Sequence, residues 1–294
     1  MYEMNKELKV FLKRTYIKIL SKKSIMPLLY VEYLRSYKKI LNLSDPKTFG
    51  EKIQWMKKNG NLERYRDFVD KFLVRSYVEK KLGKDYLVKL YGVYNNFDEI
   101  NFEELPKKFV FKPNNSSGDI IICKNKSVLD LKKTKKQLDK WLKRDFYDYT
   151  REIQYKGIER KIICEEYLED SPGSLKDYKI FCFNGKPEFI QVDFDRHTNH
   201  KRNFYDLNWK RIYMEVAYVE HKKGIDKPKE FDELIKAATK LSEGFPFVRV
   251  DLYIVQEKVY FGELTFTPGN GKDPFRPLRE DLKVAAKINL EKYL

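Results

Sequence analysis

The sequence is poor in the residues that build disulfide frameworks, zinc sites and imidazole catalysis. Its 294 residues include only three cysteines and three histidines. Cys123, Cys164 and Cys182 stand too far apart for a CxxC metal motif or a disulfide framework. We therefore expect a protein of the reducing cytoplasm whose stability rests on its core.

Long apolar runs are missing as well. No stretch approaches the roughly 18 apolar residues that cross a bilayer, and the N-terminus lacks the apolar core and cleavage site of a signal peptide. The two commonest nucleotide loops, GxxxxGK[ST] and a strand-to-helix GxGxxG, are also absent. The sequence predicts a protein that stays inside the cell and uses neither of these loops.

Positive charge is in excess. Sixty Lys and Arg against 44 Asp and Glu give a net charge of +16, beside 42% hydrophobic and 15% aromatic residues. That apolar content is enough for a folded core, which excludes a disordered chain and puts the charge on the surface. A basic surface attracts nucleic acid, anionic membrane or acidic polysaccharide, and charge alone does not choose among them.

Hydrophobic periodicity predicts an α+β protein with helices concentrated early and strands late. Residues 1–40 form a basic amphipathic helical region, broken near Pro27, which either packs as a surface helix or contacts an anionic membrane. Further helices are expected over 48–55, over 62–81 with Gly83 as the stop, and over 127–145. Strands are expected over 86–94, 109–112, 120–123, 161–168, 178–183, 187–194, 247–255 and 258–264.

A first candidate site is the loop between the strands at 109–112 and 120–123. Lys112 ends an apolar strand, and the polar loop that follows contains Ser116, Ser117 and Gly118. A lysine beside a Ser/Gly loop places an ammonium and backbone N–H groups around phosphate oxygens. A plain hairpin turn is the alternative interpretation.

A second candidate site lies near the C-terminus. A tight turn at 256–257 puts Asp251 and Glu263 on neighbouring antiparallel strands, with both carboxylates on one face. Arg249 shares that face because it lies two positions before Asp251. Opposed carboxylates need a cation between them, and hard oxygen ligands suit Mg²⁺. Two solvent-exposed strand carboxylates are the alternative.

A third candidate site begins where the strand at 161–168 ends in acidic residues. A Ser/Pro/Gly loop separates this strand from Asp177 and Lys179. Charged groups at a strand entrance can receive a ribose and a phosphate. An exposed sheet edge explains them equally well.

The order of these features resembles the ATP-grasp superfamily, and most closely its TupA-like branch, named for teichuronopeptide biosynthesis. The resemblance spans residues 70–270. Further words typical of the branch are Lys47-Thr48-Phe49-Gly50-Glu51-Lys52-Ile53-Gln54-Trp55 and Asp195-Arg196 followed by Asn203-Phe204-Tyr205-Asp206. The shared motifs run in this order: Asp70-Lys71, Tyr91-Gly92-Val93-Tyr94, Phe109-Val110-Phe111-Lys112, Ser116-Ser117-Gly118, Glu165-Glu166-Tyr167-Leu168, Asp177-Tyr178-Lys179, Arg249-Val250-Asp251 and Glu263 to Gly269.

The resemblance implies an ATP-grasp fold, in which two α+β subdomains clamp ATP behind a basic helical N-terminal region. It implies a helical region over 1–60 and a preceding segment over 61–106. The small subdomain with the phosphate loop then covers 107–168, and the large subdomain with the metal site covers 169–294.

The resemblance also assigns roles to residues. The catalytic residues would be Arg249, Lys112 and Lys179. Position 265 is Thr, where many relatives have Asn, and this leaves open whether one or two Mg²⁺ ions bind. Asn115 stands where a His is expected in the phosphate loop. The phosphates of ATP would contact Lys71, Lys112, Ser116, Ser117 and Gly118. The adenine would contact Glu165, Glu166, Tyr167 and Leu168, and the ribose would contact Asp177. The residues that would hold Mg²⁺ are Asp251, Glu263 and Thr265.

The implied activity is carboxylate–amine ligation in cell-surface polysaccharide biosynthesis. A carboxylate takes the γ-phosphoryl group of ATP, and an amine then displaces phosphate to form an amide. The substrates would be an acidic polysaccharide or sugar uronate and an amino acid, at the cytoplasmic side of the membrane. Arg151, Arg196, Lys201 and Arg202 are candidates for holding the acidic glycan, and His197, His200 and His221 are expected to be structural.

Two alternatives stay open. A kinase or glycosyltransferase of the same pathway would use one acceptor or no ATP. A basic nucleic-acid-binding protein would use its charge and its 21 Tyr and 20 Phe as stacking platforms. Because most of these aromatics lie in apolar strand-like runs, core packing explains them better, and no specific nucleic-acid partner is expected.

Overall fold

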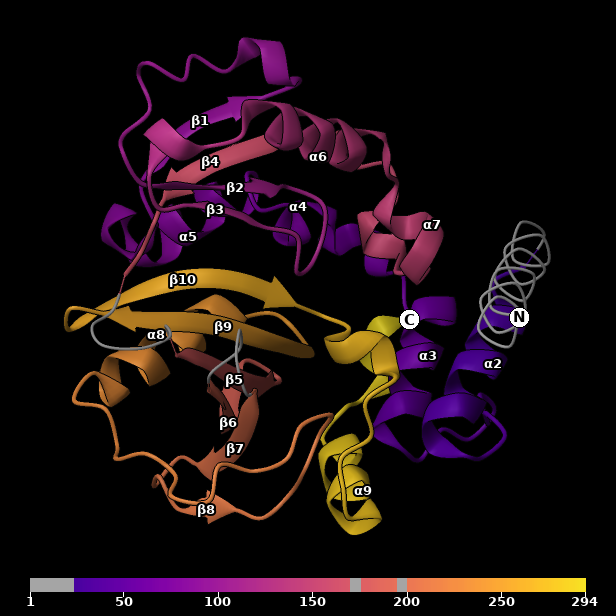
Figure 1. Ribbon diagram of the computed structural model, residues 1–294. Coiled ribbons are helices and arrows are strands. Elements are labelled where there is room, and N and C mark those ends of the chain that lie inside the picture. The colour runs from indigo at the N-terminus through magenta and orange to yellow at the C-terminus, as the bar shows by residue number, and fades with distance from the viewer. Residues whose placement is uncertain (1–23, 170–175, 195–199) are drawn as a thin grey trace, which may run out of the picture. The chain divides into compact units, whose positions relative to one another are not determined.

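The computed structural model describes residues 24–169, 176–194 and 200–294 (Figure 1). The chain divides into two compact units. The helical unit comprises Met1–Asn61 and Gly269–Leu294, and the sheet unit comprises Leu62–Pro268. The first 23 residues of the expected basic helical region lie outside the described residues. The subdomain boundaries expected from the sequence stay a prediction.

The helical unit joins helices from both ends of the chain. Asp281, on α9, is fully buried and accepts hydrogen bonds from the backbone N–H of Phe49 (2.7 Å) and of Phe275 (3.0 Å) and from the Tyr37 hydroxyl (3.1 Å). Pro27 lies in the first turn of α2, where its missing N–H costs nothing. The elements are α2 (Met26–Tyr37), α3 (Phe49–Asn59), α9 (Leu278–Ala286) and the 3₁₀ turns η6 (Pro268–Gly271) and η7 (Leu290–Tyr293).

The predicted helix over 48–55 is confirmed as α3. The Thr48 side chain accepts a hydrogen bond from the N–H of Glu51, and the Glu51 carboxylate accepts one from the N–H of Thr48, which forms a capping box. The start of α3 is thus stabilised by hydrogen bonds between Thr48 and Glu51.

The sheet unit contains a four-stranded antiparallel sheet in the order β1-β4-β2-β3. Figure 1 shows α6 running along this sheet, and Leu138 and Trp141 of α6 pack in one core cluster with Phe109 and Phe111. Alternation along β2 turns Lys112 to the opposite face. The elements are β1 (Leu90–Tyr94), β2 (Phe109–Pro113), β3 (Ile121–Cys123), β4 (Ile162–Glu166) and α6 (Leu131–Lys143).

A six-stranded antiparallel sheet follows, in the order β10-β9-β5-β6-β7-β8. Val250 and Leu252 of β9 are buried on the side where α8 packs against β5, β6 and β9, and Arg249 and Asp251 alternate with them on the other side. The elements are β5 (Asp177–Phe183), β6 (Lys186–Phe194), β7 (Lys201–Asp206), β8 (Arg211–Ile212), β9 (Phe247–Val255), β10 (Lys258–Thr265) and α8 (Phe231–Ser242).

The unbroken helix predicted over 62–81 is wrong. Asp70 has extended backbone angles, and its carboxylate accepts hydrogen bonds from the N–H groups of Phe72 (2.8 Å) and Leu73 (3.2 Å). An Asp side chain that competes with the backbone in this way ends a helix. The segment is therefore η1 (Leu62–Tyr65), α4 (Arg66–Val69) and α5 (Val74–Leu82).

Other differences concern short or late elements. The strand predicted over 86–94 begins only at Leu90, and the helix predicted over 127–145 is confirmed as α6 with a shorter span. The predicted concentration of helices early in the chain missed α8 and α9. The remaining elements are η2 (Lys84–Tyr86), η3 (Phe97–Glu99), η4 (Lys126–Val128), α7 (Phe146–Thr150) and η5 (Ile153–Tyr155).

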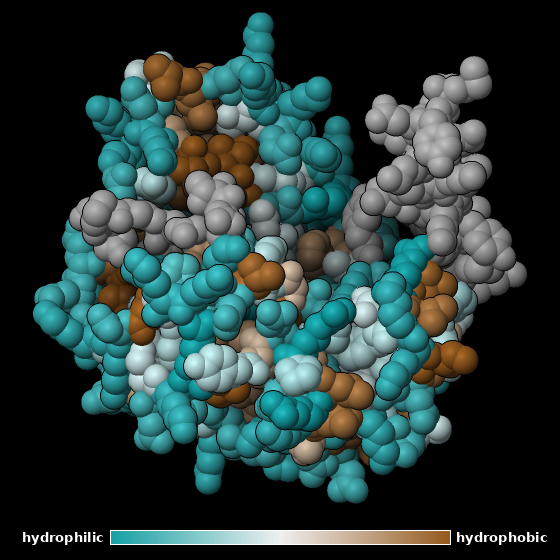
Figure 2. All heavy atoms as spheres, turned by 60° about the horizontal axis from the view of Figure 1, so that its bottom comes forward, coloured by the Kyte–Doolittle hydropathy of each residue, from teal (hydrophilic) through white to brown (hydrophobic). Residues whose placement is uncertain are grey.

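The surface agrees with the composition. On the face drawn in Figure 2, hydrophilic side chains dominate and hydrophobic ones form small separate groups. Within the described part of the chain, no helix combines the length and the apolar character that a membrane crossing requires.

Candidate active site

Asp251 and Glu263 face each other across β9 and β10, as the sequence predicted. They are register partners, and Asp251 is 1% exposed. Arg249 donates to both Asp251 oxygens, at 2.7 Å each, and Lys179 from β5 donates at 2.8 Å. The register also pairs Lys179 with Asp251 directly. One buried carboxylate is thus held by two cations from two strands.

The charges of this group depend on one another. Burial alone would raise the pKa of the Asp251 carboxyl, but Arg249 and Lys179 outweigh burial and hold that pKa below its ordinary value. Burial likewise acts to lower the pKa of Arg249, and Asp251 and Glu263 more than offset it. Asp251 is therefore ionised at neutral pH, which is the form that coordinates a metal.

The oxygens of Asp251, Glu263 and Thr265 suit a Mg²⁺ ion that is also coordinated by phosphate oxygens. The Thr265 hydroxyl lies 3.2 Å from Arg249 Nη2 and 3.3 Å from Glu263 Oε1. No group of three or more His, Cys, Asp or Glu that could hold a metal occurs among the described residues. Two carboxylates and a hydroxyl are hard oxygen donors, and Mg²⁺ normally completes such a set with phosphate and water oxygens.

On the four-stranded sheet, Lys112 is held by a buried carboxylate. Glu165 accepts from Lys112 Nζ at 2.9 Å and from Arg75 Nη1 at 3.0 Å. Arg75 also donates to the carbonyl of Val88, at 2.8 Å. With both of its oxygens engaged by cations, Glu165 retains only its backbone for reading an adenine, and the sequence had not singled out Arg75.

Lys71 is placed by the helix break at Asp70. Its N–H donates to the carbonyl of Asn114 at 3.0 Å, its ammonium donates to the carbonyl of Ser116, and the Asn114 amide donates to Asp70 at 2.7 Å. Burial lowers the pKa of Lys71, while Glu263 acts against that shift. The turn before α5 and the phosphate loop are therefore tied together.

The charges acting on Lys71 come from both sheets. Glu263 belongs to the six-stranded sheet, and Lys112 and Glu165 belong to the four-stranded sheet. The pKa of Lys71 thus responds to charged residues of both sheets.

The other expected nucleotide contacts are exposed to different degrees. Ser116 is buried, and Ser117 and Gly118 form the exposed tip of the loop, where Gly118 has φ +80°. Glu166, Tyr167 and Leu168 are half-buried at the end of β4. Asp177 is 1% exposed, with its carboxylate 3.7 Å from Lys179, so its side chain lies inside the polar network of the six-stranded sheet.

The described residues proposed to hold a glycan differ in their surroundings. Arg202 is nearly buried and donates to both oxygens of Asp193, at 2.6 and 3.2 Å. His200 stacks on Tyr218 with ring centroids 3.6 Å apart, and Arg151 is buried. Arg196 and His197 lie outside the described residues.

A segment that sequence reasoning missed contacts the chain just after β10. Gln154 Nε2 donates to Thr267 Oγ1 at 2.8 Å, and the Thr267 hydroxyl in turn donates to Glu152. All three side chains are buried. Nothing in the composition of 152–155 marks it as functional, because its contact with the residues after β10 joins positions more than a hundred apart.

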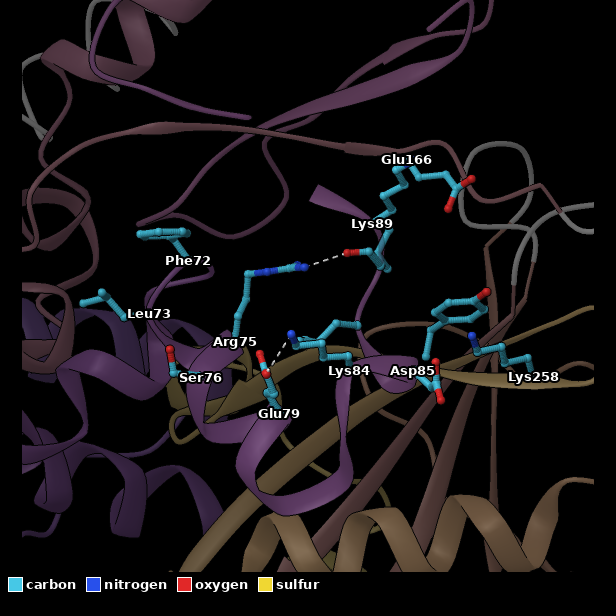
Figure 3. A pocket seen from close by; sticks show the side chains of 13 residues that line it. Phe72, Leu73, Arg75, Ser76, Glu79, Lys84, Asp85, Lys89, Glu166 and Lys258 are labelled. Atoms are coloured by element: carbon cyan, nitrogen blue, oxygen red, sulfur yellow. Dashed lines mark hydrogen bonds and ion pairs between the residues drawn. The ribbon is translucent and has the colours of Figure 1, made fainter. Parts of the chain in front are cut away.

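A pocket of about 450 Å³ lies beside Arg75, between α5, η2, the end of β4 and the start of β10 (Figure 3). Figure 3 shows Arg75 reaching across it to the Val88 carbonyl and Lys84 pairing with Glu79. Neither Lys112 nor Asp251 lines this pocket. Of the charged residues described above, Arg75 and Glu166 line it.

Two α+β layers, one carrying lysines and the other carboxylates, define an ATP-grasp protein. The family model described as "TupA-like ATPgrasp" matches residues 51–289. The chain therefore belongs to the TupA-like ATP-grasp family.

Solved structures with similar folds include two ligases and a synthetase. D-alanine–D-alanine ligase from Bacillus anthracis with ATP is 17% identical over 67% of this chain and 53% of its own length, with a TM-score of 0.39. The ligase PsnB complexed with a precursor variant, Mg and ADP is 10% identical over 83% and 66% of the two chains, with a TM-score of 0.43. D-cycloserine synthetase DcsG is 12% identical over 78% and 71%, with a TM-score of 0.45.

The chain spans 53% and 64% of the length of two Bacillus anthracis D-alanine–D-alanine ligase structures. The search of curated proteins found no match.

Proposed function

We propose that the protein is an ATP- and Mg²⁺-dependent carboxylate–amine ligase of cell-surface polysaccharide biosynthesis. One observation carries the proposal: the charges around Lys71 belong to both sheets, Glu263 to one and Lys112 and Glu165 to the other. Lysine ammonium groups together with carboxylates that can hold a metal are what a metal-bound triphosphate requires. Membership of the TupA-like ATP-grasp family supports the same activity.

Each side chain has a task in this proposal. Lys71 and Lys112 bind phosphate oxygens, and the backbone N–H groups of the 116–118 loop add donors. Asp251, Glu263 and the Thr265 hydroxyl hold Mg²⁺. Arg249 and Lys179, already fixed against Asp251, stabilise the negative charge of the transferred group without having to be reoriented.

ATP supplies the γ-phosphoryl group, which passes to a carboxylate to give an acyl phosphate and ADP, and an amine then displaces inorganic phosphate to form the amide. This chemistry needs no nucleophile from the protein. The described cysteines agree with that, because all three are buried and burial raises the pKa of Cys164 and Cys182 to about 12. A protonated, buried thiol is a poor nucleophile.

The proposed substrates are an acidic polysaccharide or sugar uronate, as carboxylate, and an amino acid, as amine. The net charge of +16 favours association with an acidic glycan and with the anionic inner face of the membrane. The family description, TupA-like, supports the same substrate class. Arg151, Arg196, Lys201 and Arg202 stay candidates for binding the glycan.

The test is release of ADP by the purified protein with Mg·ATP, an oligosaccharide containing glucuronic acid, and single amino acids. Ligation requires both substrates, so ADP release that depends on the amino acid and yields an amide-linked product by mass spectrometry is the expected result. ADP release with the glycan alone and a phosphorylated product would establish a kinase instead. Consumption of a nucleotide sugar without ATP would establish a glycosyltransferase.

A further inference from the structure

The pocket beside Arg75 is lined by charged side chains of both signs (Figure 3). Lys89, just before β1, and Lys258, the first residue of β10, supply ammonium groups. Asp85 of η2 and Glu166, the last residue of β4, supply carboxylates. Within the described residues, none of these four side chains forms an ion pair.

Other charges of the pocket already have partners. Lys84 Nζ lies 3.5 Å from a carboxylate oxygen of Glu79, and Arg75 Nη1 lies 3.0 Å from one of Glu165. A ligand that enters the pocket can therefore use the other four charges without breaking an existing ion pair.

The two ammonium groups are positioned by aromatic rings. Lys89 Nζ lies 5.3 Å from the ring centroid of Tyr91, and Lys258 Nζ lies 5.1 Å from that of Tyr260. A ring attracts a cation without accepting its N–H groups as a carboxylate does. Both lysines thus keep hydrogen-bond donors for another acceptor.

The pocket also has an apolar part and a suitable size. Its volume of about 450 Å³ falls in the range of small-molecule sites, roughly 300–1,000 Å³. Apolar walls exclude water, and this strengthens the interaction between a ligand charge and a protein charge. The apolar and aromatic residues that line it are Phe72, Leu73, Leu87, Val88 and Tyr260.

The charge pattern selects the class of ligand. A simple anion would be repelled by Asp85 and Glu166, and a simple cation would be repelled by Lys89 and Lys258. A free α-amino acid carries one carboxylate and one ammonium, so each of its charges meets partners of opposite sign and forms charge-assisted hydrogen bonds. An apolar side chain on that amino acid matches the apolar part of the pocket.

We propose that this pocket binds a free α-amino acid with an apolar side chain. The site goes beyond the ligase function proposed above, because neither Lys112 nor Asp251 lines the pocket. Glu166 is also an expected adenine contact, so the experiment has to show that the amino acid and the nucleotide bind independently.

NMR titration of the full chain measures its affinity for L-leucine, for leucinamide, which lacks the carboxylate, and for N-acetyl-L-leucine, which lacks the ammonium. We expect leucine to bind and each derivative to bind at least about tenfold more weakly, because each loses one set of charge-assisted hydrogen bonds. The leucine affinity should stay within about twofold when saturating Mg·ADP is present.

Variants locate the binding. Asp85→Asn and Lys258→Gln should each lower the leucine affinity about fivefold, and both side chains are exposed, so the fold should be kept. Lys156→Gln is the matched control and should leave the affinity unchanged. Lys156 is also exposed and lies over a tyrosine ring, 5.8 Å from the centroid of Tyr147, but it does not line the pocket.

The outcomes separate this proposal from the ligase function. Absence of leucine binding, equal affinities for leucine and its derivatives, or variants at Asp85 and Lys258 that bind leucine like the parent would each overturn the amino-acid site. Displacement of leucine by Mg·ADP would overturn it as well, because the pocket would then belong to the nucleotide site. A parent protein that binds leucine but no Mg·ADP would keep the amino-acid site and remove the ligase function.

Discussion

At the residue scale, the site is built from carboxylates that are each held by two cations. Glu165 is paired with Lys112 and Arg75, and Asp251 is paired with Arg249 and Lys179. A buried carboxylate without such partners would take up a proton or destabilise the fold. These pairs keep the carboxylates ionised and hold the cations where the proposed phosphates need them.

Lys112→Ala should abolish ATP-dependent turnover and leave the fold intact, because it removes a phosphate-binding ammonium from a half-exposed position. Glu165 keeps Arg75 as its partner in this variant. Lys108→Ala is the control: Lys108 also forms an ion pair, with Glu169, but at the surface. Undiminished ADP release by Lys112→Ala, with the substrates of the proposed reaction, would remove Lys112 from the site.

Asp193→Asn should lower the free energy of unfolding by about 3 kcal/mol near neutral pH, because it breaks a buried ion pair and strands Arg202. Burial acts to raise the pKa of Asp193, yet Arg202, Lys179 and His200 hold it well below the ordinary value. A depressed carboxyl pKa stabilises the fold above the unfolded value, about 3.9, and this stabilisation is lost as the pH falls toward the folded value.

Urea unfolding of the parent protein and of Asp193→Asn at about pH 5 and about pH 3.5 measures that loss, and both values lie below the ordinary His pKa of about 6.5. The stability difference between the two proteins should shrink at the lower pH. A difference that stays constant, or grows, would show that the ion pair is not the source of the stability.

At the element scale, the turn between α4 and α5 matters more for the position of Lys71 than either helix does. The Asp70 carboxylate accepts hydrogen bonds from two backbone N–H groups and from the Asn114 amide. This one side chain therefore holds the turn between α4 and α5 and fixes that turn to the loop after β2. Burial raises the pKa of Asp70, and these donors act against that rise. Lys71 thus lies in a turn between α4 and α5 that Asp70 stabilises.

Asp70→Ala should cost about 2 kcal/mol of stability, because it leaves the N–H groups of Phe72 and Leu73 and the buried Asn114 amide without their acceptor. It should also weaken Mg·ADP binding, since Lys71 and the loop lose their common anchor. Asp67→Ala, on the same short helix, removes an acid with no such contacts and is the control. Equal nucleotide affinities of the two variants by calorimetry would contradict the anchoring role.

The hairpin of β9 and β10 also carries an irregularity that serves the site. The register shifts between Phe261 and Glu263, and a Cβ at Gly262 would lie 2.8 Å from the Tyr253 ring and 3.0 Å from the Asp251 carbonyl. Only glycine permits this close approach. The bulge sets Glu263 opposite Asp251.

At the scale of the whole molecule, every residue assigned to the nucleotide and the metal lies within Leu62–Pro268. The helical unit is organised separately, around the hydrogen bonds that Asp281 accepts from Phe49, Phe275 and Tyr37. The N-terminal and C-terminal segments of this unit are thus joined through one buried carboxylate.

Asp281→Ala should therefore destabilise the helical unit by about 3 kcal/mol, because three buried donors lose their acceptor. Mg·ADP affinity should stay within about twofold of the parent value, since no assigned nucleotide contact lies in that unit. Differential scanning calorimetry and titration calorimetry check the two expectations. A large loss of nucleotide affinity with little change in stability would reverse the division of roles.

The sequence by itself determined the strand pair with Asp251, Glu263 and Arg249, because period-two alternation and a tight turn are local properties. It also determined the hairpin after Lys112 and the start of α3 at Thr48. The tertiary structure alone decided that Arg75 holds Glu165, that Asp70 accepts a hydrogen bond from the Asn114 amide, and that η5 is fastened to Thr267. Those contacts join residues 90, 44 and 113 positions apart, and no local pattern encodes such pairings.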